Sequence, residues 1–285
     1  MKPKVKYTSI YSCKDKYPIT TMCEFFEVSR SGYYDFIKRI NSTDKDERLG
    51  RMIKECQEHS GKTYGYRRVL IWLQRKKHIV VNHKSILRIM NKYGLLSEIR
   101  RRKRYKQMGQ HLHKYDNLLN RDFTAIRPNQ KWVTDISYIH TGQGVLYLSM
   151  IRDLYDESIV AYKMGTEQNV NLVLNTIKSA KTKEKITEEL QLHSDQGLQY
   201  TSKGYFDLTK EYGITPSMSR RGNCYDNAMA ENFFGILKCE CIYRRKPTTF
   251  DEARKFIDDY IYFYNYERIQ LKTKLTPYEK RCQIA

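Results

Sequence analysis

The sequence predicts an α/β protein in which a basic helical half precedes a core of strands and helices built around a mixed sheet. Charge is the first observation: residues 1–130 hold 30 Lys and Arg against 12 Asp and Glu, whereas residues 131–285 hold 22 against 20. Periodicity is the second, because helical spacing gives way to short β-rich runs near residue 131. A basic half beside a nearly neutral half indicates a polyanion-binding module joined to a part with another task, with simple solubility as the alternative.

The bulk composition narrows the class of protein. A chain of 285 residues, of which 40% are hydrophobic, has room for two or three domains. No apolar run approaches the roughly 18 residues that span a bilayer, and the N-terminus shows no secretory signal. The seven cysteines form no CxxC pair, so we expect reduced thiols and a cytoplasmic protein. We expect no zinc site at His111 and His113, because no cysteine pair lies nearby.

Residues 1–60 are predicted to be helical. A first helix carries three apolar residues at helical spacing, Met22, Phe25 and Phe26. Either Ser29 or Ser31 can cap the helix that follows. Two short helices with a tight break are compatible with a helix-turn-helix, and plain helical packing is the alternative.

Residues 61–106 are predicted to form a second, more basic region that resembles a helix-turn-helix and binds DNA. Its first helix presents the apolar stripe Val69, Leu70, Trp72 and Leu73. Asn82 is a good cap for its second helix, and Gly94 ends that helix. Outward-facing side chains on such a helix can lie in or across a DNA groove, although a solvated helix face is the alternative. The candidate DNA contacts are Arg67, Arg68, His83, Lys84 and Arg88, then Arg101, Arg102, Lys103 and Arg104 in a run that can follow phosphates.

After a polar linker at 107–128, residues 129–245 are predicted to form the catalytic core, and residues 246–285 a C-terminal helical extension. The expected strands and helices of the core, in order, are strands 131–141, 145–154 and 158–165, helix 169–181, strand 190–195, helix 203–212, strand 214–219 and helix 226–243. This order is typical of a mixed α/β sandwich.

Three acids in this core have the chemistry of a metal site. Asp135 lies within a strand, Asp195 ends a strand, and Glu231 lies on a helix after 35 intervening residues. Mg²⁺ and Mn²⁺ prefer oxygen ligands, and two such ions ~3.5–4 Å apart can clamp an in-line phosphoryl displacement. The sequence therefore indicates an enzyme that cuts and joins DNA.

Other acids are alternatives at two of these three positions. Asp153 or Asp156, on or after the second strand, could replace Asp135. Asp226 could replace Glu231, although its expected role is to cap the helix. Asp135 is preferred because it lies in the stretch WVTDISYI (132–139), whereas Asp153 and Asp156 lie outside it.

A histidine precedes one of the acids. His193 lies two residues before Asp195, so on a strand the two side chains point the same way. His193 could orient a ligand, contact DNA or merely pack.

Three stretches resemble the DDE integrase core of bacterial insertion-sequence transposases. They are WVTDISYI (132–139), HSDQGLQYTS (193–202) and SRRGNCYDNAMAENFFGILK (219–238). Within that group they resemble the OrfB product of the insertion-sequence-three family, which shares the acid spacing and a basic residue seven positions after the glutamate, here Lys238. The stretch YFYNYERIQLKTKLTPYEK (262–280) resembles the C-terminal signature of that family, with Gln270 where the common form has His.

The resemblance implies an RNase H-like fold and DNA strand cleavage at insertion-sequence ends followed by strand transfer, that is, transposition with DNA integration and recombination. Carried over by position, Asp135, Asp195 and Glu231 become ligands of two Mg²⁺ ions, for which Mn²⁺ can substitute, and Lys238 becomes a DNA contact. The implied partners are double-stranded terminal-repeat and target DNA, further copies of the chain and an upstream OrfA-type product. A catalytically silent DNA-binding regulator of transposition and a nuclease acting on RNA–DNA hybrids are the alternatives.

Overall fold

The computed structural model describes residues 3–41, 44–98, 115–184, 189–220 and 224–283 and divides the chain into two compact units, residues 1–55 and 56–285. The first unit holds α1 (Pro3–Ser12), α2 (Ile19–Phe25) and α3 (Arg30–Asn41), and α4 (Glu47–His59) crosses the boundary. Ile10, Met22 and Tyr33 are buried at its core. Ser29 caps α3, because its hydroxyl accepts a hydrogen bond from the Gly32 amide at 3.1 Å.

The apolar residues at helical spacing in α2 are buried to different extents. Met22 is buried, whereas Phe25 is 80% exposed. The reason is that α2 ends at Phe25, so a residue in its last turn need not follow the buried stripe of a longer helix.

In the second unit, α5 (Tyr66–Lys77) and α6 (His83–Lys92) form the predicted helix pair. Val69, Trp72 and Leu73 of α5 are buried, as are Ile86 and Met90 of α6. The predicted cap of α6 is confirmed, because the Asn82 side chain accepts a hydrogen bond from the Lys84 amide at 2.8 Å. Gly94 has a φ of 65°, which suits glycine just beyond a helix end.

The core is built on one five-stranded mixed sheet in the order β3-β2-β1-β4-β5. Its strands are β1 (Lys131–Thr141), β2 (Gly144–Asp153), β3 (Ile159–Gly165), β4 (Gln191–Ser194) and β5 (Thr215–Met218). The first three strands form an antiparallel meander, whereas β4 and β5 run parallel to β1. The predicted mixed sheet is thus confirmed, with strand bounds within two residues of those expected.

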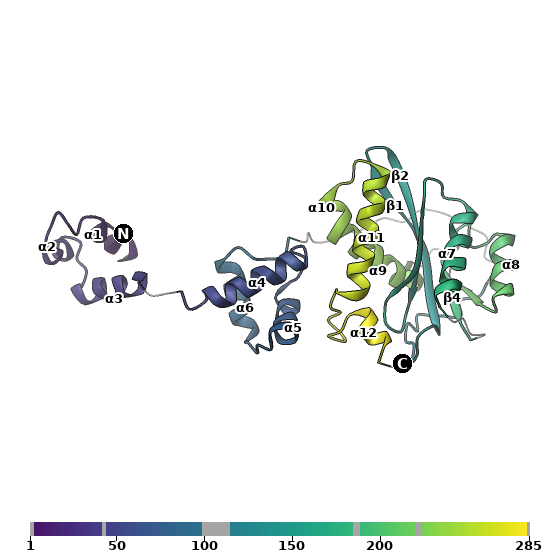
Figure 1. The fold of residues 1–285 in the computed structure, drawn as a ribbon, viewed down its shortest axis with the longest axis horizontal. Coiled ribbons are helices and arrows are strands. Elements are labelled where there is room, and N and C mark those ends of the chain that lie inside the picture. The colour runs from purple at the N-terminus through teal and green to yellow at the C-terminus, as the bar shows by residue number, and fades with distance from the viewer. Residues whose placement is uncertain (1–2, 42–43, 99–114, 185–188, 221–223, 284–285) are drawn as a thin grey trace. The chain divides into compact units, whose positions relative to one another are not determined.

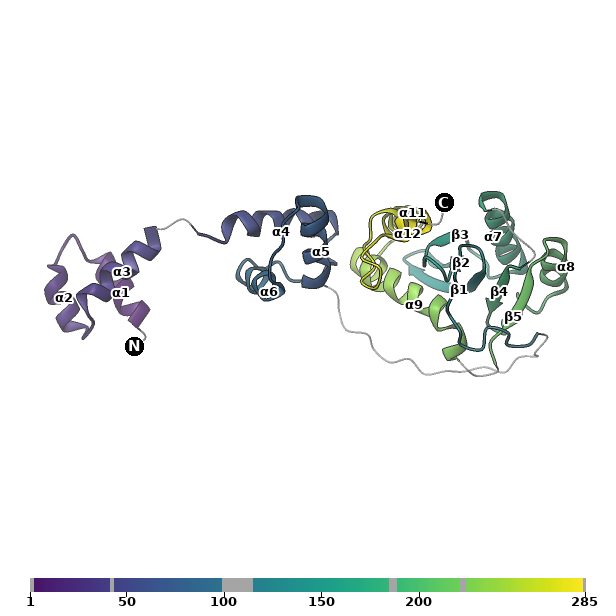
Figure 2. The same ribbon diagram turned by 90° about the horizontal axis from the view of Figure 1, so that it is seen from below.

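Helices cover both faces of this sheet (Figures 1 and 2). On one face lie α7 (Val170–Lys183) and α8 (Lys203–Glu211), whose apolar residues share a cluster with Trp132 and Ile136 of β1. On the other face lie α9 (Ala228–Leu237) and α11 (Phe250–Tyr266), which share a cluster with Val133 and Ile139. Alternate residues of β1 therefore belong to opposite layers, as the period of two in a strand requires.

The helix predicted at 226–243 is four short elements instead of one. They are the 3₁₀ turn η1 (Cys224–Asn227), α9, the π-helical turn η2 (Lys238–Ile242) and α10 (Tyr243–Arg245). The chain then continues through α11 to α12 (Pro277–Arg281), and both of these helices begin with a capping box, from Thr249 and Thr276 respectively. No helix in the described part of the chain is long and apolar enough to cross a membrane.

Candidate active site

Strand pairing brings two of the three predicted acids together. Val133 of β1 pairs with His193 of β4 in a parallel ladder. Asp135, within β1, and Asp195, directly after β4, each lie two residues further along, so they lie at the same level on adjacent segments. Neighbouring strands lie about 4.8 Å apart, which places these two carboxylates side by side at the end of β4.

Local hydrogen bonds orient both carboxylates. An Asp135 oxygen accepts from the Ile136 amide at 2.7 Å, and an Asp195 oxygen accepts from the Gly197 amide at 2.9 Å. A side chain at position 197 would be crowded, because a Cβ there would lie 3.0 Å from Oδ1 of Asp195. Glycine at this position therefore leaves the Asp195 carboxylate room beside its own turn.

The third acid comes from the helix that covers β1. Ala230, Phe233 and Leu237 of α9 are buried in the cluster that contains Val133. Glu231 and Lys238, seven residues apart, share one flank of this helix because seven residues make about two turns, and this flank lies about 100° from the buried residues Ala230 and Leu237. Glu231 is exposed and Lys238 half-buried.

The three acids are close enough to influence one another. Burial raises the pKa of Asp135 well above its usual range, and the charges of Asp195 and Glu231 raise it further, while the Ile136 amide and Lys238 oppose the shift. Burial also lowers the pKa of Lys238, and the charge of Asp135 opposes that shift. Mutually repelling carboxylates at one point form an oxygen-donor set that fits a hard divalent cation. Within the described residues, no three His, Cys, Asp or Glu side chains are already arranged to enclose a metal ion.

The two alternatives to Asp135 have a different surrounding. Asp153 and Asp156 are fully buried, and Arg281 of α12 binds both, at 3.2 and 2.7 Å. Arg281 also binds Glu184 at 2.7 Å. Asp153 ends β2 opposite Trp132, three residues before Asp135 on β1. These acids belong to an ion-pair cluster with Arg281, which favours Asp135 for the site.

Asp226, the alternative to Glu231, is likewise engaged elsewhere. Its buried carboxylate accepts from Arg121 at 2.9 Å, from the Arg220 side chain at 3.1 Å and from Asn117 at 2.9 Å. Arg220 and Arg121 keep the pKa of Asp226 far below its usual range, although burial alone would raise it. Its expected capping role is wrong, because the residue before α9 is Asn227 and no side chain caps the helix.

Two further residues, Asn227 and Tyr200, support the acids. The Asn227 side chain donates to the Thr134 carbonyl at 3.3 Å, which ties the start of α9 to the strand that carries Asp135. Tyr200 is buried with its hydroxyl 3.4 Å from Thr134 Oγ1, and burial and the two aspartates raise its pKa. The only sequence feature that could have pointed to Tyr200 is its place in the same motif as Asp195.

His193 packs inside the core. It is fully buried, and its ring nitrogens lie 2.8 Å from Ser217 Oγ and 3.1 Å from Ser219 Oγ. Burial lowers its pKa to about 4, so the ring is neutral at physiological pH. Because both nitrogens are used and neither is exposed, the structure favours the packing alternative over the DNA contact that we predicted.

The predicted DNA contacts of the helix pair divide into two groups. His83, Lys84 and Arg88 are exposed on α6, and Arg67 is exposed on α5. Arg68 instead turns inward, since its Nε donates to the Ile269 carbonyl at 3.0 Å, so its prediction as a DNA contact is not supported. Arg101, Arg102, Lys103 and Arg104 lie outside the described residues.

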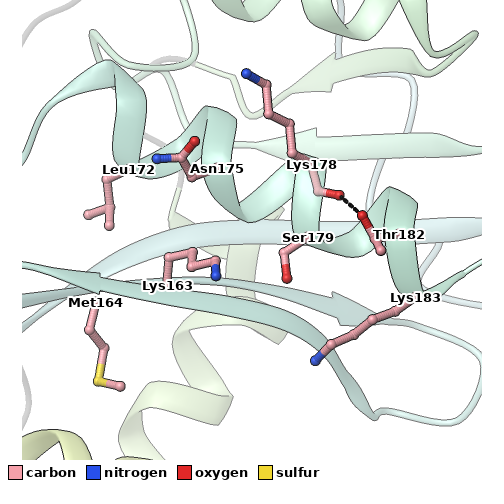
Figure 3. A pocket seen from close by; sticks show the side chains of 8 residues that line it. All are labelled: Lys163, Met164, Leu172, Asn175, Lys178, Ser179, Thr182 and Lys183. Atoms are coloured by element: carbon pink, nitrogen blue, oxygen red, sulfur yellow. Dashed lines mark hydrogen bonds between the residues drawn. The ribbon is translucent and has the colours of Figure 1, made fainter.

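A basic groove lies away from the acids, between β3 and α7 (Figure 3). It has a volume of about 500 Å³, and its lining includes Lys163, Lys178 and Lys183 but no acid. Figure 3 shows Lys163 and Lys183 reaching toward the space beside Ser179, with Lys178 pointing away from them. Lys183 lies in the last turn of α7, where a cation stabilises the helix dipole whether or not a ligand binds.

Family models match most of the chain. The model described as "Integrase core domain" matches residues 125–224, and a second model with the same description matches residues 231–284. The model described as "HTH-like domain" matches residues 43–103.

Several bacterial proteins are similar along most of their length. The putative transposase InsK for insertion sequence element IS150 of Escherichia coli (strain K12) is 38% identical over 268 residues, which cover 94% of each chain. An uncharacterized transposase-like protein of Haemophilus influenzae is 43% identical over 209 residues, or 73% of this chain and 96% of that protein. The transposase InsF for insertion sequence IS3A of E. coli (strain K12) is 30% identical over 264 residues, or 90% and 91% of the two chains.

One of the solved structures that match this chain is that of the HTLV-2 integrase catalytic core domain in complex with magnesium, in its trimeric form. It has 14% sequence identity and a TM-score of 0.46, and the match covers 55% of this chain and 99% of that one.

Proposed function

Because the chain belongs to the insertion-sequence-three family of DDE transposases, we propose that it cuts and joins DNA with Asp135, Asp195 and Glu231 as its catalytic acids. One observation carries this assignment. The β1–β4 register and the packing of α9 on β1 bring acids from three elements close enough for two of them to raise the pKa of the third. The competing acids are bound in separate clusters with arginines.

Members of the integrase-core fold depend on a divalent metal ion, and we propose that this chain binds two Mg²⁺ ions, with Mn²⁺ as a substitute. Asp135, Asp195 and Glu231 would hold them. When bound, the ions would polarise a water and stabilise the charge that develops on the phosphodiester.

The proposed reaction has two steps, cleavage and strand transfer. A water oxygen attacks a phosphodiester at the element end, the P–O3′ bond breaks, and the leaving 3′ oxygen takes up a proton to become a 3′-OH. In strand transfer that 3′-OH attacks a target phosphodiester and loses its proton, and the broken bond leaves a new 3′-OH in the target. Lys238, beside Asp135, is positioned to bind a phosphate of the DNA end.

An HTH-like domain model matches residues 43–103, and we propose that the chain binds DNA through this region. We propose that the exposed cations of α6, Lys84 and Arg88, contact the phosphate backbone, which would make binding strongly dependent on salt. We further propose that copies of the chain assemble on two DNA ends and that an upstream OrfA-type product takes part.

The assignment is tested by nicking and joining of a labelled DNA end taken from the flanks of the gene, with and without Mg²⁺. The wild type should cut and join, whereas Glu231→Gln should bind the DNA but do neither. Glu211→Gln is the matched control, because Glu211 is an exposed glutamate of the same core on α8 and should leave both steps unchanged. If the wild type binds DNA but never cuts it, even with the upstream product, the regulatory alternative is correct instead.

A further inference from the structure

The C-terminal signature at 262–280 contributes Arg268 to a buried ion pair. This pair does not include any of the three proposed catalytic acids. Arg268 donates to Glu240 through two nitrogens, at 2.8 and 2.7 Å, and the Tyr260 hydroxyl donates to the same carboxylate at 2.7 Å. The side chains of Arg268 and Glu240 are only 2% and 5% exposed. Burying two charges costs free energy that their attraction barely returns, so such a pair contributes little to stability. Its bidentate geometry is better suited to fixing the orientation of the two side chains relative to each other.

The pair is attached to the helix that carries the catalytic side chains. Glu240 lies in the π-helical turn η2, which continues α9 from Lys238 onward. It follows Lys238 by two residues, so it points to roughly the opposite side of the helix, at about 100° per residue. Arg268 and Glu240 therefore hold α9 from behind, while Glu231 and Lys238 face the acids on the strands. Single π-turns of this kind are frequent at functional sites.

The other end of the pair is attached to the start of the helix-turn-helix-like region. The Ile269 amide donates to the Tyr64 hydroxyl at 3.0 Å, and that hydroxyl donates to the Glu267 carbonyl at 3.3 Å. Tyr64 is 1% exposed. Arg68 donates to the Ile269 carbonyl at 3.0 Å. The backbone on both sides of Arg268 is thus held by two residues at the beginning of α5.

This connection contains one unsatisfied group. Nη1 of Arg268 is buried and has no hydrogen-bond partner among the described residues. A buried donor left without a partner costs roughly 1–3 kcal/mol.

We propose that Glu240 and Arg268 are positioning residues that couple DNA binding by the α5–α6 region to the placement of Glu231 and Lys238. The proposal rests on the proposed function, in which α5 and α6 contact DNA and α9 carries the catalytic glutamate. A shift at the start of α5 moves Tyr64, Tyr64 moves the backbone around Arg268, and Arg268 turns η2 and α9 through Glu240. The C-terminal signature thereby serves the acids without touching DNA.

Tyr64→Phe tests this coupling with a single-atom change. It removes the hydroxyl that joins Tyr64 to Glu267 and Ile269 and keeps the buried ring. Tyr162→Phe is the matched control, because it removes a hydroxyl that donates to Asp258 at 2.8 Å on the far edge of the sheet. Arg268→Lys is the second variant, since it keeps the charge but loses the two-pronged bond.

The full-length proteins are compared in two measurements with the labelled duplex. Fluorescence anisotropy gives the Kd for DNA, and hydrogen exchange of peptides from 228–242 reports on α9 and η2. In the wild type and in Tyr162→Phe, DNA should slow exchange in these peptides by about fivefold, roughly the effect of one hydrogen bond on an opening equilibrium. Tyr64→Phe and Arg268→Lys should bind DNA with the Kd of the wild type but show no such slowing. Their cleavage rate at saturating DNA should be about tenfold to a hundredfold lower, as expected for a displaced catalytic group.

The outcomes separate the two proposals. If the wild type does not bind the duplex, the proposed function fails and this inference fails with it. If DNA binds and is cut, but Tyr64→Phe and Arg268→Lys keep the protection of α9 and the cleavage rate of the wild type, the coupling is wrong and the proposed function stands. Unchanged exchange in peptides from β1 and β2 serves as the control for folding.

Discussion

Replacing Arg281 by methionine should destabilise the core more than any surface change. Arg281 is the cation that faces the two fully buried carboxylates of Asp153 and Asp156. Breaking a buried pair by removing one partner costs roughly 3–5 kcal/mol, because a buried charge is left without compensation. At about 2–4 °C per kcal/mol for a unit of this size, the midpoint of thermal unfolding should fall by roughly 6–20 °C.

The effect of this substitution should also depend on pH. Burial, reinforced by the charge of Asp156, raises the pKa of Asp153 to about 6, and Arg281 opposes the shift. A carboxyl whose pKa is raised in the folded state contributes stability below its unfolded pKa, and this contribution is lost as pH rises through the folded pKa. Without Arg281 the folded pKa should rise further. The variant should therefore recover part of its deficit at pH 5 and show the full deficit at pH 8.

Urea unfolding of wild type and Arg281→Met, followed by tryptophan fluorescence between pH 5 and pH 8, measures both effects. Trp132 reports directly on this region, since its Nε1 lies 3.3 Å from Asp153. Arg254→Met is the matched control, because Arg254 pairs with an exposed Asp251 and should cost less than about 1 kcal/mol. A deficit for Arg281→Met equal to that of the control, or one that does not change with pH, would refute the reasoning.

Three further predictions follow from the site and from α6. Gly197→Ala places a Cβ 3.0 Å from Asp195 Oδ1, so it should raise the metal concentration needed for half-maximal cleavage without changing the unfolding midpoint. The prediction would be contradicted if the variant needed the same metal concentration as the wild type. Lys84→Gln should weaken binding to all DNA sequences alike and reduce the slope of log K against log salt by about 1, and an unchanged slope would remove Lys84 from the interface. Because burial lowers the pKa of His193 to about 4, its ring signals in NMR should not titrate between pH 5 and 8. The stability linked to the neutral ring should be complete above the unfolded pKa of about 6.5 and should be lost progressively as pH falls from there through about 4. An NMR titration midpoint near 6.5 would contradict the burial of the ring.

Much of the architecture follows from patterns that span only a few residues. The strand at 131–141 has the same bounds in the structure as in the sequence-based prediction, and the asparagine cap of α6 is where its residue type predicts. Such features depend on backbone hydrogen bonding and side-chain periodicity within one element. The order of residue types along the chain is therefore enough to predict them. The acids of the site were also predicted, because their residue type and spacing match a known family.

The partners of the other charged residues could not be predicted in this way. Asp226 was expected to cap its own helix, but it binds Arg121, which precedes it by 105 residues in a stretch predicted to be a linker. The helix predicted at 226–243 contains a π-helical turn, and that turn brings Glu240 to Arg268.

By itself, the sequence determined the class of this protein: the order of strands and helices, the basic half and the family, together with three acids as candidates for the site. Only the tertiary structure decided which acids lie together, since the β1–β4 register places Asp135 beside Asp195, whereas Arg281 binds Asp153 and Asp156. The physical reason is the distance along the chain over which each kind of interaction acts. Periodicity and capping act between residues close in the chain, whereas a buried charge must be matched by whatever partner the packing of distant segments brings within about 3 Å.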